Sequence, residues 1–145
     1  MSSALFSSLE QDRVEELIEN GGFELSALNK ETVILSPECN TNKMGIFLSG
    51  KGEVFRVKPD GGTVLLNTLS SGECFGIISV MCPETPLTTY VRTKSKSTVI
   101  FFSRQELNNL IEKEAQIARN LIEFMANRIA FLNEKIATFS SDTVT

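Results

Sequence analysis

The sequence predicts a mainly β domain with flanking helices, followed by a long C-terminal helix. Two observations carry this prediction. Between residues 23 and 103, short β-branched or alternating runs are separated by glycine-containing turns, which is typical of a β-sandwich or a small barrel. From Arg104 onward, apolar residues recur every three or four positions instead, which is the spacing of one face of a helix.

Composition describes a globular chain and excludes several classes of function. The 145 residues suit one domain, and 41% of them are hydrophobic. The net charge of −4 does not favour nucleic-acid binding by this chain itself. Because no apolar run approaches the ~20 residues of a membrane span and the N-terminus does not resemble a signal peptide, we expect a cytoplasmic protein without membrane contact. The lack of histidine removes the commonest metal ligand and general base, so we expect no enzyme, metal or cofactor.

The strands and turns follow one another along the first two thirds of the chain. A short helix is expected over residues 4 to 20, stopped by the glycines that follow Asn20. Strands are expected over 32–36, within 44–69, and over 88–95 and 97–103. The stretches 49–52 and 59–62 are turn signals, because their glycines reach the positive φ that such turns require.

The C-terminal region predicts two helices, the second of which is a candidate dimer helix. Ser103 and Glu106 fit a capping box at the start of the first helix. The stretch 117–138 contains neither proline nor glycine. Its apolar stripe has the spacing of a coiled-coil seam and predicts a homodimer: Ala118, Leu121, Met125, Ile129, Leu132 and Ile136. The alternative is that this helix packs on its own barrel.

Three motifs in order give the chain a resemblance to a known family. They are Leu48-Ser49-Gly50 with Gly52 and Val54, the Asp60-Gly61 turn, and Gly72-Glu73-Cys74-Phe75-Gly76. Together they resemble the sensory domain of the CRP/FNR family of bacterial transcription regulators.

This resemblance implies a fold and a division of the chain. The fold it implies is a double-stranded β-helix, or jelly roll, with a long dimerisation helix. Residues 1–103 would form the N-terminal helix and the sensory jelly roll, and 104–138 the helices. Residues 139–145 would form a hinge toward a DNA-binding domain that is absent from this chain, so that DNA is bound only through that missing domain.

The resemblance also implies where a ligand would bind. In cyclic-nucleotide-binding relatives a glutamate after the Phe-Gly pair holds the ribose, and a later arginine pairs with the phosphate. Ile77 and Leu87 occupy those positions here, and Leu132 and Asn133 occupy those of two polar residues that contact the base. Because removing one partner of a buried charge pair costs about 2–5 kcal/mol, we expect an unidentified small-molecule effector other than cyclic AMP.

The candidate site residues surround these substituted positions. They are Phe75, Gly76, Ile77, Ile78, Leu87, Thr88, Thr89, Leu132 and Asn133, with Val80 in the lining and Phe55, Leu65 and Val91 nearby. If Leu87, Thr89 and Val91 face inward, strand alternation turns Arg92 outward, so that Arg92, Lys94 and Lys96 form a solvated face. The competing interpretation is that the apolar residues are ordinary barrel core.

Several alternatives remain open at this stage. Cys39, Cys74 and Cys82 are too few for a four-thiolate iron–sulfur cluster, and are either redox-active or plain buried thiols. The chain could also be a stand-alone interaction module, or a sensor that binds a cyclic nucleotide by altered contacts. A cupin-like enzyme on the same fold would need metal ligands, which are usually histidines.

Overall fold

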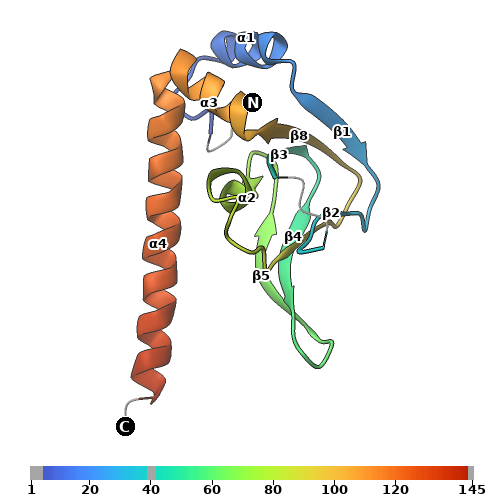
Figure 1. Ribbon diagram of the computed structural model, residues 1–145, viewed down its shortest axis with the longest axis vertical. Coiled ribbons are helices and arrows are strands. Elements are labelled where there is room, and N and C mark those ends of the chain that lie inside the picture. Colours follow the sequence, from blue (N-terminus) through green and yellow to red (C-terminus); the bar gives the residue numbers. More distant parts are fainter. Residues whose placement is uncertain (1–4, 39–41, 144–145) are drawn as a thin grey trace.

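The computed structural model describes residues 5–38 and 42–143, and shows strands flanked by helices, with one long helix along one side (Figure 1). In chain order the elements are α1 (Gln11–Gly21), β1 (Glu24–Leu28), β2 (Val33–Leu35), β3 (Lys43–Ser49), β4 (Gly52–Val57), β5 (Thr63–Leu69), β6 (Cys74–Phe75), α2 (Ile77–Met81), β7 (Tyr90–Thr93), β8 (Ser97–Ser103), α3 (Arg104–Lys113) and α4 (Ala115–Thr143). Within these ranges, no helix combines the length and the apolar character that a membrane span requires.

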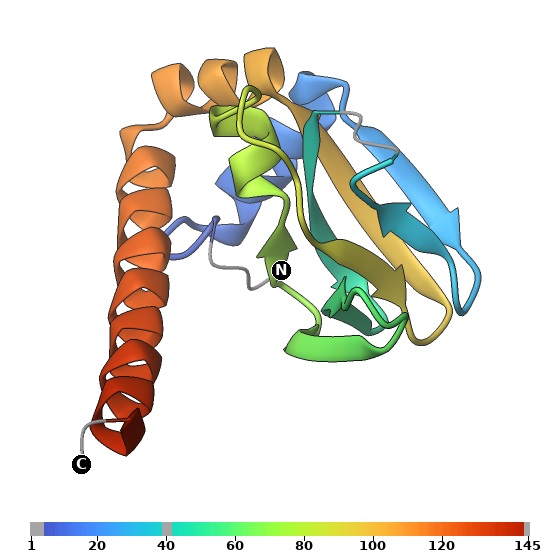
Figure 2. The same ribbon diagram turned by 60° about the horizontal axis from the view of Figure 1, so that its bottom comes forward.

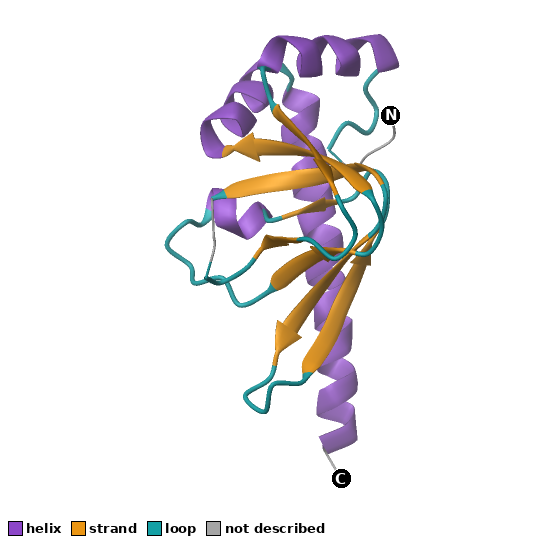
Figure 3. Ribbon diagram, turned by 90° about the vertical axis from the view of Figure 1, so that its right-hand side faces the viewer, coloured by secondary structure: helices purple, strands orange, loops and turns teal. Residues whose placement is uncertain are grey.

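The strands form two four-stranded sheets, ordered β1-β8-β3-β6 and β2-β7-β4-β5. Every pairing is antiparallel. Consecutive strands such as β7 and β8 lie in different sheets, which is how a jelly roll builds its two faces. The predicted mainly β fold with flanking helices is therefore confirmed. Figure 3 shows the strands crossing in front of α4.

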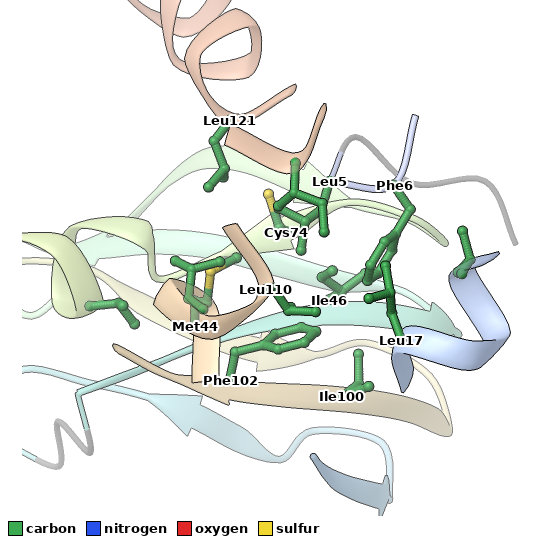
Figure 4. Close-up of a cluster of buried hydrophobic side chains, with 14 residues drawn as sticks. Leu5, Phe6, Leu17, Met44, Ile46, Cys74, Ile100, Phe102, Leu110 and Leu121 are labelled. Carbon is green, nitrogen blue, oxygen red and sulfur yellow. The ribbon is translucent and has the colours of Figure 1, made fainter. Parts of the chain in front are cut away.

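Two apolar clusters hold the fold together. One lies under the helices, where side chains of β3, β8, α1, α3 and α4 converge (Figure 4). Its members include Met44, Ile46, Phe102, Leu107 and Ile117, all 0% exposed. The other cluster lies between the two sheets and contains Leu35, Phe47, Leu69, Phe75, Val91 and Val99. Burial on both faces of the β3–β8 pair fixes its register, because a slip by one residue would exchange the two sets.

The helix ends agree with the sequence in part. The capping box at α3 is present: Glu106 N donates to Ser103 Oγ at 3.2 Å, and Ser103 N donates to Glu106 Oε1 at 2.9 Å. The first helix is shorter than expected and begins at Gln11. The last helix is longer than expected, because it starts at Ala115 and continues to Thr143, through most of the segment predicted as a hinge.

A buried asparagine attaches the start of α4 to the N-terminal segment. Asn120 is 5% exposed. Its Nδ2 donates to the backbone oxygens of Leu5 at 2.9 Å and Ser7 at 2.6 Å. Its Oδ1 accepts from Gln116 Nε2 at 3.0 Å. These bonds fix the first turns of α4 against the domain, and the helix then runs along one side of the strands (Figure 2).

Candidate functional site

A cavity of about 380 Å³ lies between the strands and α4. Its walls come from β2, β4, β5, β6, α2, the segment leading into β7, β7 itself and α4. The lining residues are Leu35, Val54, Asn67, Leu69, Cys74, Phe75, Gly76, Ile77, Ile78, Leu87, Thr89, Val91, Phe124, Met125, Arg128, Ile129 and Leu132. Most are apolar, so this cavity suits an uncharged surface better than a strongly hydrated one.

Gly76 sets the direction of the α2 wall. Its φ of 79° lies in the left-handed region, which favours glycine. A Cβ at this position would also lie 2.9 Å from the backbone oxygen of Lys43, so a side chain would not fit. The turn at Gly76 directs the chain from β6 into α2, and thereby brings Ile77 and Ile78 into the cavity wall.

The wall next to β7 begins before the strand, which starts at Tyr90 and not at residue 88 as expected. Leu87 and Thr89 in the preceding segment and Val91 within β7 all line the cavity, in agreement with the expected inward orientation. Arg92 faces the other way: its guanidinium carbon lies 4.6 Å from the centroid of the Phe55 ring, and its Nε lies 3.4 Å from Glu31 Oε2. Arg92 therefore belongs to an ion-paired outer face and is no substitute phosphate ligand.

The structure gathers most of the candidate site residues around one cavity. Phe75, Gly76, Ile77, Ile78, Leu87, Thr89 and Leu132 line it, whereas Thr88 and Asn133 are exposed and do not. Three further expectations fail. Val80 is 1% exposed and belongs to the cluster under the helices. Phe55 stacks on Tyr90 and does not line the cavity, because Val54 is the β4 residue that faces it. Leu65, on β5, is 54% exposed and does not line the cavity either.

The α4 wall contains a cation that the sequence patterns did not reveal. Phe124, Met125, Arg128, Ile129 and Leu132 line the cavity from this helix. Their spacing of three and four residues places them on one helix face. Among the described residues, Arg128 is the charged member of the lining. Apolar periodicity does not reveal this residue, because an arginine on a long helix is normally predicted to face solvent.

The described cysteines differ in their surroundings. Cys74 lines the cavity wall and is 5% exposed, whereas Cys82 is exposed. Burial raises the pKa of the Cys74 thiol to about 12, while the charge of Arg128 acts in the opposite direction. The Cys74 thiol is therefore neutral at physiological pH and behaves as a small apolar group. Cys39 lies outside the described residues.

The predicted dimer stripe divides into two parts in the structure. Leu121 is 5% exposed and packs in the cluster under the helices, and Ala118 is half-buried. Met125, Ile129, Leu132 and Ile136 are 36%, 59%, 50% and 62% exposed. Ile122 and Phe131 add 65% and 44% exposed side chains on the same helix. The part of α4 that is open to a partner thus begins after Leu121.

The chain is similar to proteins and domains of known families. A model of the "Cyclic nucleotide-binding domain" family matches residues 25–114. A "CRP-like cAMP-activated global transcriptional regulator" from Mycobacterium tuberculosis is 27% identical over 96 residues. That alignment covers 66% of this chain and 42% of the relative, so the chain spans less than half of the regulator's length.

Solved structures show the same fold. The catabolite activator protein of Thermus thermophilus superimposes with a TM-score of 0.84 at 22% identity, covering 95% of this chain and 63% of that one. Oxidized CprK in complex with o-chlorophenolacetic acid superimposes with a TM-score of 0.76 at 13% identity, covering 91% and 54%. At these identities the likeness concerns the fold, and it agrees with the jelly roll described above.

Proposed function

The chain belongs to the cyclic nucleotide-binding domain family, and from this premise we propose that it is the effector-sensing and dimerisation domain of a CRP/FNR-type bacterial transcription regulator. Its effector is a small molecule other than cyclic AMP. It acts as a binding domain in the cytoplasm, and DNA is contacted by a separate domain. The aligned relative from Mycobacterium tuberculosis is itself described as a transcriptional regulator, which supports this function.

The observation that carries the effector proposal is the chemistry of the cavity wall. Ile77 and Leu87, which by the resemblance occupy the positions of a ribose-binding glutamate and a phosphate-binding arginine, both line the cavity. Among the described lining residues there is no carboxylate to accept from the free ribose hydroxyl of a cyclic nucleotide. A hydrated sugar phosphate entering here would lose water without recovering equivalent hydrogen bonds. The fold itself does not restrict the ligand, since a CprK structure with the same fold contains o-chlorophenolacetic acid.

Signal transmission in this proposal passes through α4. The helix forms one wall of the cavity and also presents exposed apolar side chains beyond Leu121. A ligand that binds one arrangement of the paired helices more tightly would shift their equilibrium, which is the coupling that allostery requires. The spacing of two DNA-reading domains would change with it, and half-site geometry makes that spacing matter.

The decisive experiment is a calorimetric titration of the full-length protein with cyclic AMP. We expect no binding in the micromolar range, because the Ile77 and Leu87 positions supply neither charge. A clear micromolar isotherm would refute the effector part of the proposed function. The regulator part is tested separately by the codons after Thr145: a helix-turn-helix pattern supports it, whereas a stop codon would leave an interaction module instead.

A further inference from the structure

Arg128 is placed where an apolar residue would be expected. It lies on α4 one turn from Phe124 and one turn from Leu132, and all three line the cavity. Its side chain is half-buried. The lining around it is otherwise apolar except for Cys74 and the neutral polar residues Asn67 and Thr89. Once a ligand fills the cavity, a single cation in such a wall is hydrated by few water molecules.

The guanidinium has no counterion within the part of the chain that the structure describes. Among the described residues, Arg128 forms no ion pair or hydrogen bond, and its guanidinium carbon lies 5.7 Å from the centroid of the Phe131 ring. By contrast, Arg13, Arg92 and Lys94 are each paired with a glutamate. The charge of Arg128 also reaches the cavity wall, since it lowers the pKa of Cys74 against the larger, opposite effect of burial. Arg128 thus brings a cation with five donors to the wall of a cavity whose described lining residues include no carboxylate.

We propose that Arg128 is the anion-recognising residue of this cavity, and that the effector is a small molecule with an apolar body and one carboxylate. This rests on the proposed function and deepens it. The apolar body would contact the lining from α2, β4 and β7, and the carboxylate would pair with the guanidinium on α4. Arg–carboxylate pairs are often bidentate, and they strengthen as water is excluded. At about 380 Å³ the cavity is at the small end for ligand sites.

The charge arrangement also explains why a sugar phosphate is disfavoured even with this cation present. One arginine can pair with one anionic group, but ribose hydroxyls need acceptors. Apart from the backbone, Asn67 and Thr89 are the described lining residues that carry side-chain oxygen. Asn67 Oδ1 already accepts from Thr68 N at 2.9 Å. An aromatic or aliphatic acid makes no such demand, because its remaining surface is apolar.

The experiment compares acids with their uncharged amides on the full-length protein. The probes are phenylacetate, 4-phenylbutyrate, indole-3-acetate and octanoate, each against its carboxamide, with cyclic AMP as a separate arm. Binding is measured by calorimetry and by thermal shift. We expect at least one acid to bind roughly ten- to a hundred-fold more tightly than its amide, which is the range for a hydrogen bond to a charged group.

The variant Arg128→Gln isolates the guanidinium. It should lower the affinity for the acid to about that for the amide, and so remove the difference between the two. Arg119→Gln is the matched control, because Arg119 is an exposed arginine on the same helix and does not line the cavity. The acid–amide comparison on the unaltered protein needs no variant, so the outcome does not depend on how well Arg128→Gln folds.

Each of the remaining outcomes would refute either the role of Arg128 or the proposed effector. Equal binding of acids and amides, or acid binding that survives Arg128→Gln, would overturn the role of Arg128 and leave the proposed function standing. No acid binding even at about 10 mM, where a preformed site for a cognate class of ligand should be occupied, would overturn it as well. Micromolar binding of cyclic AMP, lost in Arg128→Gln, would overturn both the ligand class and the proposed effector.

Discussion

Replacing Asn120 with alanine tests whether the N-terminal segment is held by the hydrogen bonds described at the start of α4. The change removes both Nδ2 bonds, to the backbone oxygens of Leu5 and Ser7, at 2.9 and 2.6 Å. Losing the part-buried bond to Ser7 costs about 1 kcal/mol net, and leaving the buried Leu5 oxygen unpaired costs about 1–3 kcal/mol. Because Leu5 is 1% exposed, water cannot readily replace the lost donor there.

The expected loss of stability is therefore about 2–4 kcal/mol, which for a domain of this size lowers Tm by roughly 6–12 °C. Urea unfolding followed by far-ultraviolet circular dichroism measures it, since the chain has no tryptophan. Protein concentration must be equal throughout, because an oligomer's stability depends on it. The control is Asn127→Ala, an exposed asparagine on the same helix, for which we expect a change below about 0.5 kcal/mol. Equal stability of the two variants would refute the reasoning.

Two further predictions concern α4 and the cysteines. Ile136→Asp should convert the proposed dimer to monomers, as measured by light scattering at micromolar concentration. Ile136 is 62% exposed, so a dimer interface that covers this position would have to bury the new aspartate charge. The control Asn127→Asp should leave the mass unchanged, and an intact Ile136→Asp dimer would place the interface elsewhere. At pH 8, iodoacetamide should label the exposed Cys82 and spare Cys74, whose pKa is raised to about 12 by burial; peptide mapping that finds Cys74 labelled in the folded protein contradicts this.

The features that could be predicted from the sequence are those that depend on residues close together in the chain. The capping box of Ser103 and Glu106 depends on residues three positions apart, and it is present as predicted. The turn at residues 59–62 is likewise local: Gly61 has a φ of 89°, and Gly62 N donates to Asp60 Oδ1 at 2.8 Å. The inward orientation of Leu87, Thr89 and Val91 was expected from local alternation, and all three line the cavity although only Val91 lies within β7.

Contacts between distant segments were not predictable in the same way. Val54, Asn67 and Arg128 meet around one cavity only because the sheets and α4 are brought together by the whole fold. Leu121 fits the seam spacing, but the N-terminal segment and the cluster under the helices cover it. Periodicity shows which residues share a face of a helix, and it does not show which neighbour covers each part of that face.

The residues Met125, Ile129 and Leu132 line the cavity and yet remain 36%, 59% and 50% exposed. A second copy resting on α4 would touch the very side chains that a bound molecule touches. Whatever strengthens one of these encounters must then alter the other by an equal factor, since the two share a thermodynamic cycle. The fraction of such a domain in its bound, paired form would therefore depend on two concentrations, that of the ligand and that of the protein itself.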